Sequence, residues 1–255
     1  MAYNDIIVEK KGVVAKLTIN RPPVNVLSIE TLKEMNSALG ELKNDPEVKV
    51  LLITGAGDRA FSAGVEVKDH IGDRMPIMMQ VFPELFNRLM EVDKVTIAVV
   101  NGVALGGGCE LVGGCDLAVA SEKAVFAQPE MKLGTYPGIA GVLFQRLLGI
   151  RRGLEFVLSG DNIDAKEAER IGLVNKVVPY EELEKAAEEF AQRFSGLSGI
   201  VLRMARRTMY QTADLGWDEA LKVAAEVSED VMKTEDANEG LSAFVEKRKP
   251  VWKNR

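Results

Sequence analysis

The hydrophobic and polar positions of this chain follow two periods, one typical of strands and one typical of helices. Residues 5–20 alternate apolar and polar side chains on either side of Gly12, as a half-buried hairpin does. Residues 29–45 carry apolar side chains at helical spacing, and Ser28 is a candidate N-cap in front of them. Residues 48–57 form an apolar run that ends in glycines, which predicts a strand covered on both faces.

The same two patterns continue through the middle of the chain. Residues 95–102 repeat the buried-strand pattern, and shorter strand-like segments lie at 116–121 and 124–130. Residues 75–93 have helical spacing, and Pro83 within them predicts a break or a new helix start. Because strands alternate with helices, we predict an α/β fold with a mostly parallel arrangement of strands.

Beyond Pro179 the spacing is helical throughout. The helical segments are residues 180–196, 199–214 and 216–249. We therefore predict a core over residues 1–190 and a C-terminal helical region over residues 191–255, and we expect the second to be an oligomer-forming element.

Composition and charge narrow the class of protein. The chain has 255 residues, of which 47% are hydrophobic and 27% charged, so it can bury a substantial core. Its net charge of −6 gives no indication of a nucleic-acid partner. The first residues lack a basic start and an apolar run, and no stretch of about 18 apolar residues follows. We therefore expect a cytoplasmic protein that has no signal peptide and does not enter a membrane.

Cysteine and histidine are scarce, which limits the chemistry of any site. The two cysteines, Cys109 and Cys115, are too few for a disulfide framework, and no histidine or further cysteine lies near them in the sequence to complete a metal site. His70 is the single histidine, so a metal site that needs two histidines is excluded. We expect no metal, and carboxylates are the expected groups for acid–base chemistry.

Three consecutive glycines, residues 106–108, lead directly to Glu110 among otherwise apolar residues. A strand, a glycine turn and a helix start direct unpaired backbone N–H groups outward, at the positive end of the helix dipole. Because glycine has no Cβ, a ligand oxygen can approach these groups closely, so the motif fits an anion or a developing oxyanion. Close packing of two backbones explains the same glycines equally well at this stage.

Two further segments are candidates for chemistry. Residues 55–60, "GAGDRA", match the dinucleotide pattern G-x-G-x-x-[G/A], but residues 61–64 form another turn where a helix should begin. A dinucleotide site is therefore not expected. Glu130 follows a proline and precedes a glycine-rich loop, where a single glutamate is usually solvated.

These segments together resemble the enoyl-CoA hydratase/isomerase (crotonase) family. The motifs that carry the resemblance are "AFSAGVEVK", "NGVALGGGCEL", "QPEMKLGTYPG", "SGDNIDAKEAERIGLVNKVVP" and "AFVEKRK". Their order and spacing match the family over nearly the whole chain. The resemblance implies a crotonase-like spiral of repeated ββα units, with a C-terminal helical region that builds homotrimers, often paired into hexamers.

The resemblance also implies a reaction and its residues. The backbone N–H groups of Val65 and Gly107 correspond to the family's oxyanion hole, and Glu110 and Glu130 to the two glutamates of its hydratases. The implied reaction is syn addition of water across the α,β-double bond of an acyl-CoA, through an enolate. Our hypothesis is that Glu110 activates the water, while Glu130 holds it and supplies the proton. Gly138 matches a glycine whose backbone contacts this water.

The substrate itself carries coenzyme A, so no separate cofactor is expected. The resemblance places backbone contacts to coenzyme A around Ala63 and Val65. It also places two side chains, Arg21 and Lys68, near the phosphates. Phe244 and Lys247 correspond to residues that reach the adenine end from the C-terminal region.

Two departures from the usual family pattern bear on the acyl group. Glu66-Val67 replaces the usual Asp-Ile or Asp-Leu, and "GIAGVLFQRL" replaces the usual "GAGGTQRL". Parts of the chain resemble hydratases that act on cyclohexa-1,5-diene-1-carboxyl-CoA in anaerobic aromatic degradation, and such a ring needs a wide apolar pocket. The candidate lining residues are Met75, Met78, Met79, Phe82 and Tyr136, although a methionine stripe at helical spacing is usually part of the core.

Several alternatives remain open from sequence. Double-bond isomerisation and thioester hydrolysis proceed through the same kind of enolate or oxyanion. A non-catalytic relative that binds acyl-CoA or RNA is a different class, and the glutamate pair and acidic charge argue against it. An NAD-dependent oxidoreductase rests only on residues 55–60.

Overall fold

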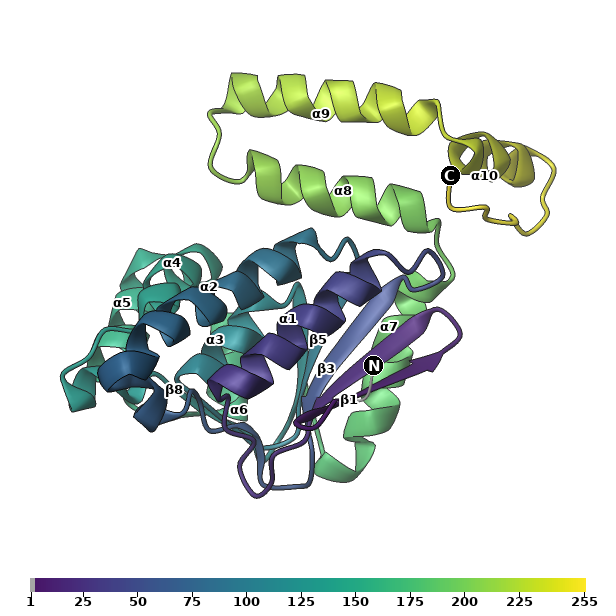
Figure 1. Ribbon diagram of the computed structural model, residues 1–255. Helices are drawn as coiled ribbons and strands as arrows, with labels where there is room; N and C mark the ends of the chain where they lie inside the picture. The colour runs from purple at the N-terminus through teal and green to yellow at the C-terminus, as the bar shows by residue number, and fades with distance from the viewer. Residues whose placement is uncertain (1–2) are drawn as a thin grey trace.

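The computed structural model describes residues 3–255 and shows a two-sheet core with a helical arm (Figure 1). Met1 and Ala2, with which the predicted core range begins, lie outside the described residues. The large sheet has the order β1-β2-β3-β5-β7-β10, and its strands are β1 (Ile6–Lys11), β2 (Val14–Ile19), β3 (Val50–Gly55), β5 (Val95–Val100), β7 (Leu117–Ser121) and β10 (Lys176–Val178). The small sheet has the order β4-β6-β8-β9, and its strands are β4 (Ala60–Ser62), β6 (Val103–Leu105), β8 (Val125–Ala127) and β9 (Ile163–Asp164).

Most neighbouring strands of the large sheet are parallel, as the sequence predicts. The exception is β1, which pairs antiparallel with β2 in the hairpin expected around Gly12. Strands β3 and β5 are buried along their whole length because both faces of the sheet are covered. One face packs into the main core, and the other packs against helix α7 (Leu183–Ser195).

The chain repeats one unit, in which a strand of the large sheet is followed by a strand of the small sheet and then by a helix. The repeats run β3-β4-α2, β5-β6-α3 and β7-β8-α4. The predicted α/β class with repeated ββα units is therefore confirmed. The helices outside α7 are α1 (Ile29–Lys43), α2 (Met75–Glu91), α3 (Gly107–Gly114), α4 (Gly138–Leu148), α5 (Ile150–Ser159), α6 (Ala165–Ile171), α8 (Gly199–Thr212), α9 (Trp217–Met232) and α10 (Glu235–Val245). Four short 3-10 helices join them: η1 (Val67–His70), η2 (Gly72–Arg74), η3 (Pro129–Leu133) and η4 (Tyr180–Glu182).

Helix α1 starts where its sequence predicts. The Ser28 side chain accepts a hydrogen bond from the Thr31 backbone N–H, which satisfies one of the unpaired donors of the first turn. Its apolar stripe is buried in the main core. The predicted end near Asp45 lies two residues beyond the observed last residue, Lys43.

The predicted break at Pro83 is wrong, because α2 runs through it without interruption. The proline removes the hydrogen bond to the carbonyl of Met79, but Met79 lies on the exposed side of the helix, where water can replace that bond. Buried side chains on both sides of the proline, Met78 and Leu85 among them, anchor the two halves in the same core. Packing therefore outweighs the local preference of proline.

Three helices form an arm on one side of the core, and α8 packs against the core through Leu202 and through Arg206, which pairs with Asp116. Figure 1 shows α8, α9 and α10 on one side of the two-sheet body, joined to it through α7. The predicted boundary near residue 190 falls inside α7, which packs on the large sheet, so the arm itself begins at α8. Large apolar side chains are exposed along the arm, among them Met209, Trp217, Met232 and Phe244.

Candidate active site

The three segments that the sequence singles out meet at one edge of the small sheet. Strands β4, β6 and β8 are mutually parallel neighbours, so their carboxyl ends lie on the same side. Val65 follows β4, the glycines 106–108 follow β6, and Glu130 follows β8. Segments that are far apart in the sequence are thereby placed together by strand pairing alone.

Gly106 lies against the carboxylate of Glu130. Its backbone has φ +49° and ψ −124°, a conformation that only glycine adopts easily. A Cβ added there would collide with Glu130 Oε1. The Gly106 N–H donates to the carbonyl of Ala127 at 2.9 Å, which ties the end of β6 to the end of β8. Glycine is therefore required at residue 106 for two reasons: the turn has a positive φ, and the carboxylate of Glu130 lies too close for a Cβ.

Gly107 opens helix α3 and lies against Val65. A Cβ added at Gly107 would collide with Val65 Cγ2, and one added at Gly64 would lie 3.6 Å from the Gly107 nitrogen. Neither the Val65 N–H nor the Gly107 N–H donates a hydrogen bond within residues 3–255. The two predicted oxyanion donors are therefore close together and unpaired.

The direction of the Val65 N–H follows from its neighbours. Residue 65 forms an isolated parallel bridge with Leu27, in which the Leu27 N–H donates to Gly64 O at 2.9 Å and the Glu66 N–H donates to Leu27 O at 3.0 Å. In such a bridge the peptide groups of the middle residue face away from the partner segment. Val65 therefore directs its N–H away from Leu27.

Glu110 projects from the first turns of α3 into a buried position. Its side chain is only 3% exposed, and its Oε1 accepts a hydrogen bond from the Ala140 N–H at 2.6 Å. Burial raises the pKa of Glu110 to about 7; the charge of Glu130 raises it too, whereas the N–H groups of Ala140 and Ile139 lower it. A carboxyl group with this pKa exchanges protons near neutral pH.

Glu130 is the second carboxyl group of the site. Its Oε2 is buried and has no hydrogen-bond partner in the described part of the chain. Burial raises the pKa of Glu130, while its own backbone N–H and the charge of His70 act in the opposite direction. Thr135 fixes the backbone here, because its N–H donates to Glu130 O at 3.0 Å and its hydroxyl donates to the same oxygen at 3.1 Å.

Comparison with known proteins identifies the family of this chain. The family model described as enoyl-CoA hydratase/isomerase matches residues 9–255. The chain belongs to the enoyl-CoA hydratase/isomerase family. The family and the enzyme class that the motifs predict are thereby confirmed.

Individual relatives of this family align over the whole chain. A short-chain-enoyl-CoA hydratase of Clostridium acetobutylicum is 39% identical over 100% of both chains. A crotonyl-CoA hydratase of Syntrophomonas wolfei is 38% identical over 98% of both. The crystal structure of an enoyl-CoA hydratase from Bacillus anthracis superposes with a TM-score of 0.93 at 32% identity, covering 99% of this chain and 100% of that one.

The candidate acyl-pocket residues occupy three kinds of position. Phe82 lies beside the oxyanion donors, since a Cβ at Gly107 would be 3.0 Å from its Cζ. Met75, Met79 and Tyr136 are exposed, Tyr136 by 71%. Met78 has no exposed surface and belongs to the main core. A role of these residues in an acyl pocket stays a prediction.

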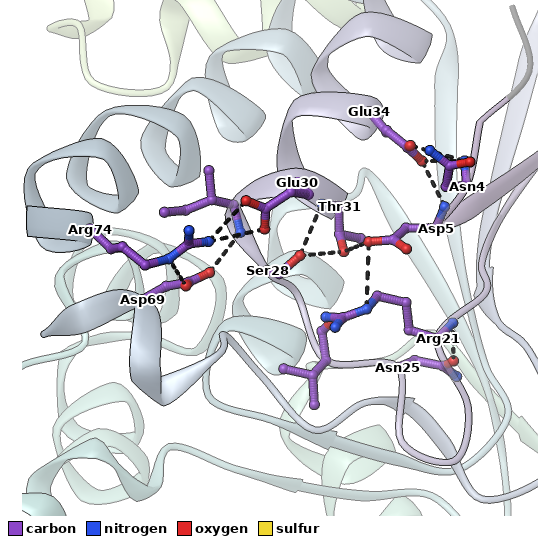
Figure 2. A network of polar contacts seen from close by, with 12 residues as sticks. Asn4, Asp5, Arg21, Asn25, Ser28, Glu30, Thr31, Glu34, Asp69 and Arg74 are labelled. Carbon is purple, nitrogen blue, oxygen red and sulfur yellow. Dashed lines mark hydrogen bonds and ion pairs between the residues drawn. The ribbon is translucent and has the colours of Figure 1, made fainter.

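The candidate coenzyme A residues are dispersed. Ala63 lies between β4 and Val65, and Lys68 is exposed on η1. Arg21 is half-buried; it donates to the carbonyl of Val26 at 2.8 Å and pairs with Asp5 at 3.5 Å (Figure 2). Phe244 and Lys247 lie at α10, across the molecule from α3 and α4 (Figure 1), so one chain does not bring them to its own glutamates.

The structure also adds residues that the sequence reasoning missed. The backbone N–H groups of Ile139 and Ala140, at the start of α4, hold Glu110. Gly138, the predicted water contact, is the first residue of the same helix. The proline and glycine before an apolar run were the available signal, because a helix start there leaves free N–H groups.

Two other kinds of site find no counterpart. After the dinucleotide-like residues 55–60 the chain continues directly into β4, and no helix begins where a pyrophosphate would need one. Across residues 3–255 no cluster of three or more His, Cys, Asp or Glu side chains is placed to hold a metal ion. Within the same residues, no helix combines the length and the apolar character that crossing a membrane requires.

Proposed function

We propose that this protein is an enoyl-CoA hydratase that adds water syn across the α,β-double bond of an acyl-CoA thioester. The observation that carries the proposal is the meeting of two carboxyl groups, the buried Glu110 and the half-buried Glu130, with two unpaired backbone N–H groups at one sheet edge. Hydration needs a base for the water, an acid for the carbon and a stabiliser for the enolate. The names of the Clostridium and Syntrophomonas relatives support the same reaction.

The oxyanion hole consists of the N–H groups of Val65 and Gly107. The thioester carbonyl accepts both hydrogen bonds, and the start of α3 adds the positive end of its dipole as the oxygen becomes an enolate. One such donor typically contributes about 2.7–4 kcal/mol to transition-state stabilisation. Coenzyme A is part of the substrate, so the reaction uses the protein's own groups.

The two glutamates divide the proton transfers. Ionised Glu110 removes a proton from water, the water oxygen bonds to Cβ, and the electrons of the double bond move into the enolate. Protonated Glu130, which holds the water, then donates its proton to Cα. The pKa of about 7 lets Glu110 exchange a proton at neutral pH, and burial raises the pKa of Glu130 as well.

Short straight-chain enoyl-CoA esters are the proposed substrates, and the cyclic dienoyl-CoA is the alternative. The printed names of the relatives favour a short chain. Purified protein is incubated with crotonyl-CoA and, separately, with cyclohexa-1,5-diene-1-carboxyl-CoA, and products are read by mass spectrometry. Addition of one water to crotonyl-CoA supports the proposal. Addition of water to the cyclic ester alone would show that the substrate is the cyclic dienoyl-CoA and not a short straight-chain ester.

The same experiment, with chromatographic separation of the acyl-CoA isomers before mass spectrometry, separates the other reactions of the family. An isomerase would give a product of unchanged mass, and a thioester hydrolase would release free coenzyme A. A non-catalytic relative would bind acyl-CoA without any product. No observation at this site favours one of these over hydration.

We also propose that the functional unit is a homotrimer, either alone or paired into a hexamer. The exposed apolar side chains of the arm support contacts between copies. Phe244 and Lys247 lie far from the glutamates of their own chain, so their predicted contacts to coenzyme A would be made in a neighbouring subunit. The cytoplasmic location stays a prediction.

A further inference from the structure

Residues 64–74 connect the oxyanion donor Val65 to α2 across the surface. The segment contains only the two short 3-10 helices η1 and η2, and large side chains such as Val67 and Ile71 face solvent. Val65 itself packs against the main core, but in residues 67–74 only Asp69 is buried, so core packing does not hold this part of the segment. The path of the chain beyond the bridge at Val65 therefore depends on polar anchors.

Asp69 is the central anchor of this segment (Figure 2). The residue is 2% exposed, and its Oδ2 accepts a hydrogen bond from the Ile29 N–H at 2.8 Å, at the start of α1. Its Oδ1 accepts from Arg74 Nε at 2.5 Å. Burial would raise the pKa of Asp69, but the bonds from Arg74 and Ile29 more than offset it and lower the pKa.

Arg74 completes the connection to α1. Its Nη2 donates to both carboxylate oxygens of Glu30, at 2.9 and 3.1 Å, while its Nε is bound to Asp69. The three side chains of Glu30, Asp69 and Arg74, here named the clamp, thus join the end of the segment to the first turn of α1. Leu27 binds the beginning of the same segment through the bridge at Val65.

The start of helix α1, to which the clamp is attached, is itself held in place. Thr31 donates its hydroxyl proton to Asp5 at 2.6 Å, and Asp5 pairs with Arg21 at 3.5 Å. Arg21 in turn donates to the carbonyl of Val26 at 2.8 Å (Figure 2). The residues before and within the first turn of α1 are therefore held from the opposite side by the N-terminal strand region.

We propose that Asp69 and Arg74 are positioning residues that fix the direction of the Val65 N–H in the oxyanion hole. Gly64, Glu66 and Asp69 are attached in succession to Leu27 and Ile29, so the Val65 peptide lies between two attached points and a third follows four residues later. Release of the clamp removes the support on the Glu66 side of the bridge, so that the bond from Glu66 to Leu27 alone must hold the Val65 peptide on that side. This inference rests on the proposed function, because it assigns a role within the same oxyanion hole.

The variant Arg74→Met removes the clamp at its half-exposed member. We expect kcat to fall by roughly 10–100-fold, because small displacements of a reacting group carry penalties of this order. KM should stay within about twofold, since the hydrogen bond from Val65 to the substrate oxygen strengthens mainly in the transition state. Arg74→Lys keeps a charge beside Asp69 and should restore part of kcat.

The matched control is Lys43→Met. Lys43 pairs with Glu91 at 2.9 Å and joins α1 to α2 at the ends remote from Val65. This ion pair is solvent-exposed, as Arg74 is in part. Its loss therefore measures the effect of removing an ion pair between α1 and α2 without changing residues 64–74. We expect kcat of this variant to equal that of the unaltered protein.

A direct readout is the infrared stretching frequency of the thioester carbonyl of bound butyryl-CoA, labelled with 13C at that carbon. Butyryl-CoA has no double bond to hydrate, so the measurement does not depend on turnover. We expect a lowered frequency in the unaltered protein and in Lys43→Met, and a frequency closer to that of free butyryl-CoA in Arg74→Met. Melting temperatures of all variants confirm that the protein remains folded.

The outcomes separate the two proposals. If Arg74→Met leaves kcat and the carbonyl frequency unchanged but raises KM, Arg74 binds coenzyme A and the positioning role is overturned. The positioning role is also overturned if Lys43→Met lowers kcat as much as Arg74→Met does. If the unaltered protein itself shows no lowered frequency with bound butyryl-CoA, the oxyanion hole is wrongly assigned and the proposed function fails.

Discussion

At the scale of the residue, the site is built from groups that are costly for folding. Glu110 is a carboxyl group with almost no exposed surface, held by two N–H groups of α4. Gly106 adopts a backbone conformation that other residues avoid, beside the carboxylate of Glu130. Sequence alone identified these residues through family motifs, but the raised pKa values and the unpaired N–H groups depend on neighbours brought in from other elements.

The buried carboxylate of Glu110 lowers the stability of the folded protein, although the proposed reaction requires it. The folded-state pKa of about 7 lies above the ordinary value of 4.5, so the unfolded chain gives up this proton first and stability falls as pH rises between these values. Glu110→Gln removes this cost and should raise the free energy of unfolding by up to about 3 kcal/mol at pH 8. Near pH 4.5 the gain should vanish.

Urea unfolding of both proteins across this pH range measures the effect. Gln keeps an oxygen that can accept from Ala140, so the packing of α4 should be preserved. A gain that does not change with pH would contradict a titrating Glu110.

At the scale of the element, three strands of only three residues each place the whole site. The sequence predicts the long strands β3 and β5, because their apolar runs are clear. It does not separate β6 from the glycine motif, since three residues are too short to show a period. The break predicted at Pro83 fails because buried side chains on both sides hold α2 together. Local pattern therefore predicts the long buried strands, but it misses a three-residue strand and the packing that keeps α2 continuous.

The turn between β6 and α3 can be tested with two glycines. Gly106→Ala introduces strain at positive φ and a collision with Glu130, whereas Gly57→Ala introduces strain at positive φ in open space. We expect Gly57→Ala to lose about 1–2 kcal/mol of stability with unchanged kcat. Gly106→Ala should lose at least as much stability, and its kcat should fall roughly 100-fold, as removal of an oxyanion donor does.

Steady-state kinetics and thermal unfolding of the two variants provide the comparison. Equal kcat values in both would mean that Gly106 serves only the backbone and that its contact with Glu130 has no role in the reaction.

At the scale of the whole molecule, the arm is the part that a single chain leaves incomplete. Trp217 on α9 is 77% exposed and Phe244 on α10 is 85% exposed, although both are large and apolar. The sequence predicts these helices from their spacing, but it does not show that α7 belongs to the core and only α8–α10 to the arm. That division depends on packing against the far face of the large sheet.

The exposed arm predicts an oligomer of defined size. Analytical ultracentrifugation should give three or six times the chain mass of 27.9 kDa. Trp217→Glu places a charge on the exposed face of α9 and should shift the protein toward smaller species. The matched substitution Tyr136→Glu, at an exposed aromatic residue of the core, should leave the mass unchanged. A monomeric unaltered protein would contradict this account of the arm.

The most direct test of the central claim is hydration of crotonyl-CoA in water enriched in 18O, followed by mass spectrometry. We expect the unaltered protein to give a product that carries one labelled oxygen. Glu110→Gln and Glu130→Gln should each remain folded and lose most of this turnover, by roughly 100-fold or more, because each lacks one of the two proton transfers. Incorporation at the unaltered rate in either variant would contradict the assignment of the two glutamates, and no incorporation by the unaltered protein would contradict hydration of this substrate.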